Sequence, residues 1–221
     1  MTKLAVIDFC DTIANFQTLD PYLEYVLKNE RKVSYILLKN RVIKVVLSLF
    51  NRIIRKLGYH RYFRKALMVA SLKGISEEAL YEYGKKYFEE RVKSNLISET
   101  IGLIEKLKSE GYMTLIVSGG SKYYIKYFAD NFGIDDVISA EIEILKGKCT
   151  GRLLRECLGK EKVEMLKEYI AEKGINVSEK LCITDSESDI PILNGCNKKI
   201  IISKNVHQEW VDESMEEIIW Q

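Results

Sequence analysis

Several features that would assign the chain to a specialised structural class are scarce in this sequence. Proline and histidine each occur only twice in 221 residues, and the five cysteines contain no Cys-x-x-Cys pair. An odd number of scattered cysteines argues against a disulfide framework, and neither histidine lies near a cysteine pair that would bind zinc. There is no internal repeat and no low-complexity segment. We therefore expect a globular protein with reduced thiols, as is typical of the cytoplasm.

Long hydrophobic runs are missing as well. No uninterrupted apolar stretch approaches the roughly 18 residues that a membrane-spanning helix needs. The first apolar run, LAVI, is followed at once by Asp8, so it does not have the form of a secretory signal. With 47% hydrophobic and 30% charged residues, the composition predicts a soluble protein with one sizeable core and an insertion.

The net charge of +2 conceals an uneven distribution along the chain. Residues 28–65 contain twelve Lys or Arg and one acid, a local net charge of +11, so the remaining residues carry −9. Such a division predicts two parts with different surroundings. If residues 36–57 form one helix, a basic stripe lies opposite a wide apolar face. The stripe consists of Arg41, Lys44, Ser48, Arg52 and Arg55.

Three interpretations of this basic stripe remain open at the level of sequence. It is the solvated face of a helix that packs inward, a surface that attracts an anionic substrate, or an interfacial helix that contacts anionic lipid. No nucleic-acid-binding motif accompanies the charge, so we expect no nucleic-acid partner.

Hydrophobic periodicity divides the chain into two kinds of segment. Residues 20–92 predict helices throughout, whereas from about residue 98 helices alternate with apolar strands and end in an acidic tail. The alternation predicts an α/β fold, a parallel sheet with helices on both faces, and the helical segment is then an insertion after the first strand. The expected domains are a core of residues 1–15 and 95–221 and a helical cap of residues 16–94. Helices are expected at 99–111, 123–133 and 162–174, strands at 112–120, 180–185 and 198–203, and a hairpin at 141–153.

The expected strand ends bring together side chains that suit phosphoryl transfer. Asp8, Ser118 and Asp185 follow strands whose carboxyl ends lie at one edge of the sheet, where open α/β folds bind ligands. With Asp189, the carboxylates suit a hard cation such as Mg²⁺. The Ser118-Gly119-Gly120 turn offers a hydroxyl and free N–H groups to phosphate oxygens. A lysine at the start of the following helix would neutralise further charge.

Four motifs occur in order along the chain: IDFCDT, LIVSGG, GKEKVEML and ITDSESD. In this respect the sequence resembles the haloacid dehalogenase (HAD)-like hydrolase superfamily and, within it, the phosphoserine-phosphatase-like branch, subfamily IB. The hairpin EIEILKGKCTGRL fits that branch too. The resemblance implies a Rossmann-like core with a helical cap inserted after strand 1. It also implies a Mg²⁺-dependent phosphatase or phosphotransferase that acts on a small, anionic phosphorylated metabolite through an aspartyl-phosphate.

The resemblance assigns roles to individual residues. Asp8 is the implied nucleophile, and Lys162 is the implied site lysine, with Lys160 as the alternative. The phosphoryl group and the substrate would be bound by Thr12, Ser118, the Gly119 N–H and Ser188. The cation would be held by Asp8, the backbone carbonyl of Cys10 and Asp185, with Asp189 as a further ligand or close by.

Two positions depart from the family pattern. Thr184 replaces the glycine that usually precedes the aspartate of the fourth motif, and Cys10 replaces the aspartate that acts as general acid and base. Asp11 is no shifted substitute, because Thr12 keeps its normal distance from Asp8 in the sequence. A thiol with an ordinary pKa of about 8.5 is a poor base at neutral pH. The sequence therefore predicts a slow enzyme. The alternatives are a silent phosphate-binding or scaffolding protein and a peripheral membrane protein that uses the basic helix.

Overall fold

The computed structural model describes residues 1–30 and 63–221. The helix expected at residues 36–57, with its basic stripe, lies outside the described residues. Within them, no helix is both long and apolar enough to cross a membrane.

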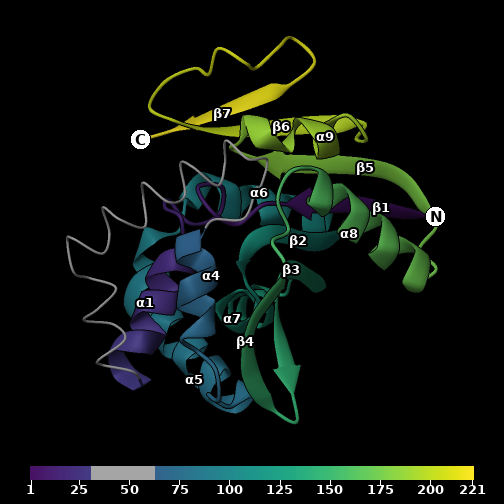
Figure 1. Ribbon diagram of the computed structural model, residues 1–221. Helices are drawn as coiled ribbons and strands as arrows, with labels where there is room; N and C mark the ends of the chain where they lie inside the picture. The colour runs from purple at the N-terminus through teal and green to yellow at the C-terminus, as the bar shows by residue number, and fades with distance from the viewer. Residues whose placement is uncertain (31–62) are drawn as a thin grey trace.

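A twisted sheet forms the centre of the protein (Figure 1). Over the described residues its strand order is β4-β3-β2-β1-β5-β6-β7, and every neighbouring pair is parallel except the hairpin β3–β4. The strands are β1 (Thr2–Ile7), β2 (Tyr112–Ser121), β3 (Asp136–Leu145), β4 (Lys148–Arg155), β5 (Val177–Thr184), β6 (Lys198–Lys204) and β7 (Glu216–Trp220). The first strand thus lies between β2 and β5, so that residue 8 emerges between the ends of both.

Helices cover both faces of this sheet, as the sequence predicts. The helical insertion after β1 contains α1 (Leu19–Glu30), α4 (Phe63–Ala70), α5 (Glu77–Tyr87), the π-helix η1 (Phe88–Val92) and the 3₁₀ turn η2 (Lys93–Asn95). The core contributes α6 (Ser98–Ser109), α7 (Lys122–Phe132), α8 (Lys160–Glu172), the 3₁₀ turn η3 (Glu187–Asp189) and the short α9 (Ile190–Leu193). The α/β fold class with its inserted helices is therefore confirmed.

The two faces of β1 show why its LAVI segment, residues 4–7, is apolar. Ala5 and Ile7 belong to the hydrophobic cluster shared with α1, α5, α6 and α7, whereas Leu4 and Val6 belong to the cluster beneath α8 and α9. All four side chains are buried. A strand covered by helices on both faces has no polar alternation, which is the pattern of LAVI.

The acidic tail expected at the end of the chain contains a further strand, which the sequence did not predict. Residues Glu216–Trp220 form β7, which pairs in parallel with β6 at the edge of the sheet. The glutamate that made this segment look like a tail is used as an acceptor: Ser203 Oγ donates to Glu217 Oε1 at 2.5 Å, and the Gln208 N–H donates to the same oxygen at 3.0 Å. Trp220 is 9% exposed and completes the apolar face. Pairing with β6, and not the local amino-acid composition, explains why this segment forms a strand.

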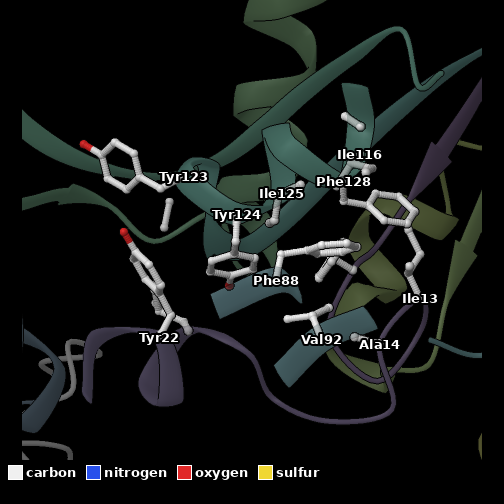
Figure 2. Packing of buried hydrophobic residues seen from close by; sticks show 14 of the residues in the cluster. Ile13, Ala14, Tyr22, Phe88, Val92, Ile116, Tyr123, Tyr124, Ile125 and Phe128 are labelled. Carbon is white, nitrogen blue, oxygen red and sulfur yellow. The ribbon is translucent and has the colours of Figure 1, made fainter. Parts of the chain in front are cut away.

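The helical insertion packs on α7 through a cluster of aromatic side chains (Figure 2). Tyr22 of α1 lies against Tyr123 and Tyr124 of α7, with the Tyr22 and Tyr124 ring centroids 5.1 Å apart. Phe88 contacts Phe128 in the same cluster, at a centroid distance of 6.0 Å. Tilted and edge-on pairs of this kind add to the stabilisation from buried area.

Backbone hydrogen bonds tie the turn between α4 and α5 to the β3–β4 hairpin. The Gly74 N–H donates to the Cys149 carbonyl at 2.7 Å, and the Cys149 N–H donates to the Ile75 carbonyl at 2.8 Å. One residue later, Ser76 caps α5 by accepting a hydrogen bond from the Ala79 N–H at 3.1 Å. Ser76 therefore marks the start of α5, next to the contacts with the hairpin.

The insertion comes very close to the core at Gly84 of α5. A Cβ atom at this position would lie 2.3 Å from the backbone oxygen of Tyr123, so only glycine fits without a shift of α5 or α7. In contrast, a Cβ atom at Gly102 of α6 would meet no atom within 4 Å.

This contrast generates a stability prediction. Gly84→Ala should lower the free energy of unfolding by about 1–3 kcal/mol, because the methyl group forces two helix backbones apart. Gly102→Ala is the matched control and should raise it by roughly 0.5–1 kcal/mol, because alanine favours the helix and nothing obstructs it. Urea denaturation followed by circular dichroism measures both. Equal effects of the two substitutions would contradict the close contact.

Candidate functional site

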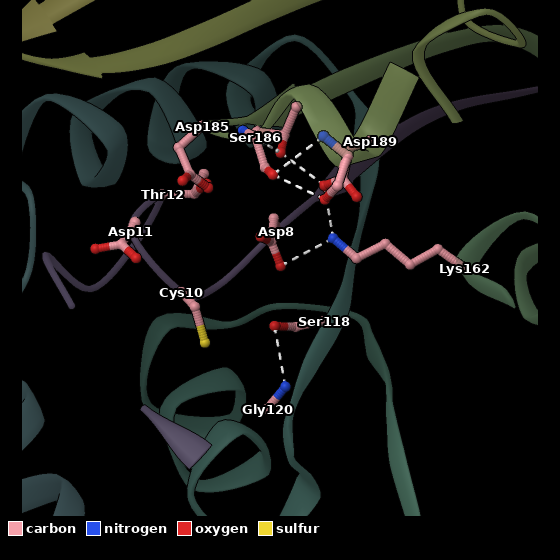
Figure 3. Close-up of polar contacts among 12 residues, drawn as sticks. Asp8, Cys10, Asp11, Thr12, Ser118, Gly120, Lys162, Asp185, Ser186 and Asp189 are labelled. Carbon is pink, nitrogen blue, oxygen red and sulfur yellow. Dashed lines mark hydrogen bonds and ion pairs between the residues drawn. The ribbon is translucent and has the colours of Figure 1, made fainter. Parts of the chain in front are cut away.

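The ends of three neighbouring strands meet at one edge of the sheet. Asp8 follows β1, Ser118 lies near the end of β2, and Asp185 follows β5. The register of the strands places Ile7 opposite both Ile116 and Ile183, so the residues beyond them converge. Figure 3 shows the side chains of Asp8, Ser118 and Lys162 directed toward one another.

The loop after β1 has an unusual backbone conformation. Asp11 adopts φ = 56°, in the left-handed region that residues other than glycine rarely occupy. Its carboxylate accepts a hydrogen bond from Gln17 Nε2 at 2.6 Å, and it points away from Asp8 in Figure 3. The Asp11 carboxylate therefore does not substitute for the family aspartate that Cys10 replaces.

Lys162 lies between two buried carboxylates. Its Nζ is 3.1 Å from Asp8 Oδ1 and 2.7 Å from Asp189 Oδ2, and the lysine is 2% exposed. Burial alone would lower the pKa of Lys162, but the charges of Asp8 and Asp189 outweigh it and raise the pKa. Lys160 is exposed. Of the two lysines considered from the sequence, Lys162 is the one beside Asp8.

Burial also acts on Asp8 itself. It raises the pKa of this carboxyl, while the ammonium of Lys162 opposes the shift. The contact between Asp8 Oδ1 and Lys162 is an ion pair without hydrogen-bond geometry, and Oδ1 has no hydrogen-bond partner among the described residues. Oδ1 of Asp8 is thus buried beside the Lys162 ammonium and has unused capacity to bind a further partner.

The last residues of β2, where the pairing with β3 becomes irregular, can be approached closely by an anion. Ser118 is fully buried, and its Oγ accepts a hydrogen bond from the Gly120 N–H at 3.3 Å. A Cβ atom at Gly119 would lie 2.6 Å from Leu158 Cδ2, so glycine keeps this backbone unobstructed. The Ser118 hydroxyl and the neighbouring N–H groups can therefore bind oxygens of a tetrahedral anion.

Asp185 has its own hydrogen-bond partner and a negative neighbour. Thr12 Oγ1 donates to Asp185 Oδ1 at 2.9 Å, and the Thr100 hydroxyl fixes the Thr12 carbonyl at 2.7 Å. Burial, followed by the charge of Asp8, raises the pKa of Asp185 to about 7. Two neighbouring carboxylates that repel each other, those of Asp8 and Asp185, form a favourable environment for a divalent cation.

Asp189 is held differently from the other two carboxylates. Its Oδ2 accepts hydrogen bonds from Lys162 Nζ and from Thr184 Oγ1, both at 2.7 Å. The described residues contain no group of three or more His, Cys, Asp and Glu side chains arranged around one point as in a metal centre. A cation bound by the carboxylates of Asp8 and Asp185 and a backbone carbonyl fits this geometry, and the contacts of Asp189 favour a place outside that set.

The thiol of Cys10 lies in a buried hydrogen-bond network. Its Sγ is 3.0 Å from Thr18 Oγ1, which in turn is 2.7 Å from the hydroxyl of Tyr124. Burial, with the charge of Asp8 as the next cause, raises the pKa of Cys10 to about 11. The thiol is therefore neutral at physiological pH and cannot serve there as a general base.

A pocket of about 600 Å³ is lined by Asp8, Cys10, Ser118, Lys162, Asp185 and Asp189, among others. Asp8, Ser118 and Lys162 form its inner end, and the exposed Ser188 also lines it. Ser188 Oγ is 2.8 Å from Ser186 Oγ, so its hydroxyl is available at the rim. The outer wall includes Gln17 and Asp20 near the start of the insertion, Lys65 of α4 and the apolar Leu19, Pro21 and Leu158.

Sequence reasoning missed three polar residues that support the site. Thr18 and Tyr124 hold the thiol, and Thr184 holds Asp189. Thr184 was recognisable as a departure from the family pattern, but its contact with Asp189 was not. No local signal points to Thr18 and Tyr124, because 106 positions separate them along the chain.

Comparison with curated proteins finds several phosphoserine phosphatases. The protein from Streptococcus thermophilus is 31% identical over 135 residues, covering 59% of this chain and 59% of that protein. The protein from Lactococcus lactis is 33% identical over 101 residues, or 47% of its length. The chain thus spans about half to three fifths of these relatives. The match to the Methanocaldococcus jannaschii protein covers 97% of this chain and 92% of that protein, at 26% identity.

Solved structures support the fold. A Bordetella pertussis protein of unknown function has a TM-score of 0.72 at 17% identity, with 91% of each chain covered. A phosphoserine phosphatase solved as a phospho-aspartyl intermediate analogue has a TM-score of 0.56 at 19% identity, covering 91% of this chain and 86% of that chain. The family model of the haloacid dehalogenase-like hydrolases matches residues 5–194. Since that match includes most of the chain, the protein belongs to the haloacid dehalogenase-like hydrolase family.

Proposed function

We propose that the protein is a Mg²⁺-dependent phosphatase or phosphotransferase that acts on a small phosphorylated metabolite through an aspartyl-phosphate on Asp8. The observation that carries this proposal is the convergence of Asp8, Ser118 and Lys162 at the inner end of one pocket. In this proposal the core domain comprises residues 1–15 and 95–221. The cap domain comprises residues 16–94.

Asp8 is the nucleophile in this proposal. A carboxylate oxygen forms a bond to phosphorus while the bond to the leaving oxygen breaks, and water later releases phosphate from the acyl phosphate. Lys162 and the Ser118 hydroxyl offset charge on the phosphoryl oxygens, and the Gly119 N–H binds another of them. Burial makes these interactions stronger than they would be in water.

The cation would be held by the carboxylates of Asp8 and Asp185 and the carbonyl of Cys10. Mg²⁺ is bound in phosphoryl-transfer sites by one or two carboxylates, the remaining positions being filled by water and substrate oxygens. When bound, it neutralises negative charge on the phosphoryl group. Thr12 orients Asp185 toward this position, and Asp189 acts through Lys162.

The outer wall of the pocket carries side chains of both charges, since Asp20 and Lys65 line it from α1 and α4. The relatives named phosphoserine phosphatase make O-phosphoserine the first compound to test.

The first prediction concerns the nucleophile. Asp8→Asn should reduce phosphate release by about 10⁴-fold or more, because the amide cannot attack phosphorus. It should also abolish the beryllofluoride adduct that we expect on Asp8 of the wild type with Mg²⁺. Phosphate release from O-phosphoserine and an aryl phosphate, together with ¹⁹F NMR of the adduct, measures both effects. Asp11→Asn is the matched control and should retain the adduct. A wild type without any adduct would contradict the proposal.

The second prediction concerns the missing acid and base. Cys10→Asp should raise the turnover of alkyl phosphates by up to about 10²-fold, because a carboxyl group protonates the leaving oxygen and then activates water. Cys10→Ser should give no such gain, since a hydroxyl does neither at neutral pH. Steady-state kinetics and the lifetime of the phospho-enzyme test this. Slower turnover in Cys10→Asp than in the wild type would give the thiol a positive role. Bound phosphate without any hydrolysis would favour a silent binding protein.

The third prediction concerns the cation. Mg²⁺ should stabilise the fold because it relieves repulsion between Asp8 and Asp185, by about 2.7 kcal/mol at one hundred times its Kd. Asp185→Asn should remove most of this effect, while Asp11→Asn should keep it. Thermal denaturation with and without Mg²⁺ measures the difference. Equal stabilisation of both variants would place the cation elsewhere.

A further inference from the structure

We propose that Thr18 and Tyr124 are positioning residues that hold the Cys10 thiol as a neutral hydrogen-bond donor directed at the leaving oxygen of the substrate. The inference rests on the proposed function and adds a role for the residue that replaces the usual aspartate. It concerns a hydrogen bond alone: the S–H bond remains intact, and the departing oxygen takes its proton from water.

The direction of each hydrogen bond in the network follows from its one unambiguous donor. The Ser121 N–H can only donate, and it donates to the Tyr124 hydroxyl oxygen at 3.0 Å. The other partner of that hydroxyl is Thr18 Oγ1, at 2.7 Å. Tyr124 is fully buried, and a buried hydroxyl proton without an acceptor is costly. Tyr124 therefore donates to Thr18.

The same reasoning extends to the thiol. Thr18 Oγ1 already accepts from Tyr124, and its own proton has the Cys10 sulfur as its acceptor, at 3.0 Å. The sulfur of Cys10 thus accepts a hydrogen bond from the Thr18 hydroxyl. Its own proton is not needed by Thr18 and can be donated on the pocket side.

A hydrogen bond donated by the Cys10 thiol can act on a substrate bound in the pocket. Cys10 lines it together with Asp8 and Ser118, and Figure 3 shows the sulfur beside the Ser118 side chain. In-line displacement places the leaving oxygen on the side of phosphorus opposite the attacking Asp8. A thiol hydrogen bond there stabilises the negative charge that develops on the leaving oxygen. The effect is largest for alkyl leaving groups, which carry the most charge when they depart.

The test compares leaving groups across hydroxyl-deletion variants. Thr18→Val keeps the side-chain shape and removes the hydroxyl, and we expect it to lower kcat for an alkyl phosphate about 3- to 10-fold more than kcat for an aryl phosphate. Tyr124→Phe should act in the same direction with a smaller effect. Thr18→Ser should restore the wild-type ratio. Tyr22→Phe is the matched control, because its hydroxyl donates to the Leu80 carbonyl in the same aromatic cluster without contacting Thr18. It should leave the ratio unchanged.

A spectroscopic measurement tests the hydrogen-bond direction without turnover. The S–H stretching band of Cys10 is isolated by subtracting the Raman spectrum of Cys10→Ser from that of the parent protein. Donation by a thiol lowers this frequency, so Thr18→Val should not raise it. A rise in Thr18→Val would mean that the thiol had been donating to Thr18, and it would overturn the proposal.

The remaining outcomes are equally decisive. An equal loss of alkyl- and aryl-phosphate turnover in Thr18→Val would assign Thr18 a purely structural role and overturn the proposal. If the wild type forms no beryllofluoride adduct on Asp8, the proposed function fails, and the leaving-group role fails with it. If the adduct forms in all variants while the turnover ratio stays constant, the proposed function stands and this inference alone is wrong.

Discussion

The ammonium of Lys162 is buried between the carboxylates of Asp8 and Asp189, and the rest of the site is arranged around it. Removing one partner of such a buried group leaves an uncompensated charge, which costs about 3–5 kcal/mol. The end of β1, which leads into Asp8, the turn η3, which carries Asp189, and the first turn of α8 must therefore be placed together. The Arg155 guanidinium at the end of β4 contributes by donating to Glu161 and Glu168 of α8, each at 2.5 Å.

Much of this arrangement was predictable from the sequence because it depends on local pattern. The central strands β1, β2, β5 and β6 each contain a short apolar run, so they stand out, and the residues after these runs must meet at the carboxyl edge. The choice of Lys162 over Lys160 needed the structure, because both are near the start of one charged helix. β7 was missed because two glutamates dominate a five-residue segment whose pairing with β6 is a tertiary effect. The Cys10 network was missed because Thr18 and Tyr124 are distant in sequence.

Close backbone contacts act together with the aromatic cluster to fix the described part of the helical insertion to the core. Gly84 of α5 lies against the backbone of Tyr123, and a Cβ atom at Gly151 of β4 would be 3.0 Å from the backbone oxygen of Ala70. Two backbones in direct contact cannot slide past each other without separating. The positions of α4 and α5, and hence of Lys65 on the pocket wall, are set by the core.

The edge strand β7 has a consequence for how unfolding of this protein is observed. Both tryptophans of the sequence, Trp210 and Trp220, occur at this end of the chain. Trp220 packs into β7 with the Lys204 ammonium 5.1 Å from its ring centroid, and Trp210 packs against the opposite hydrophobic cluster. Intrinsic fluorescence excited at the indole band therefore reports the β6–β7 margin, while far-ultraviolet ellipticity is dominated by the helices. Coincidence of the two transitions would identify one cooperative unit, and an earlier fluorescence change would mean that this margin detaches first.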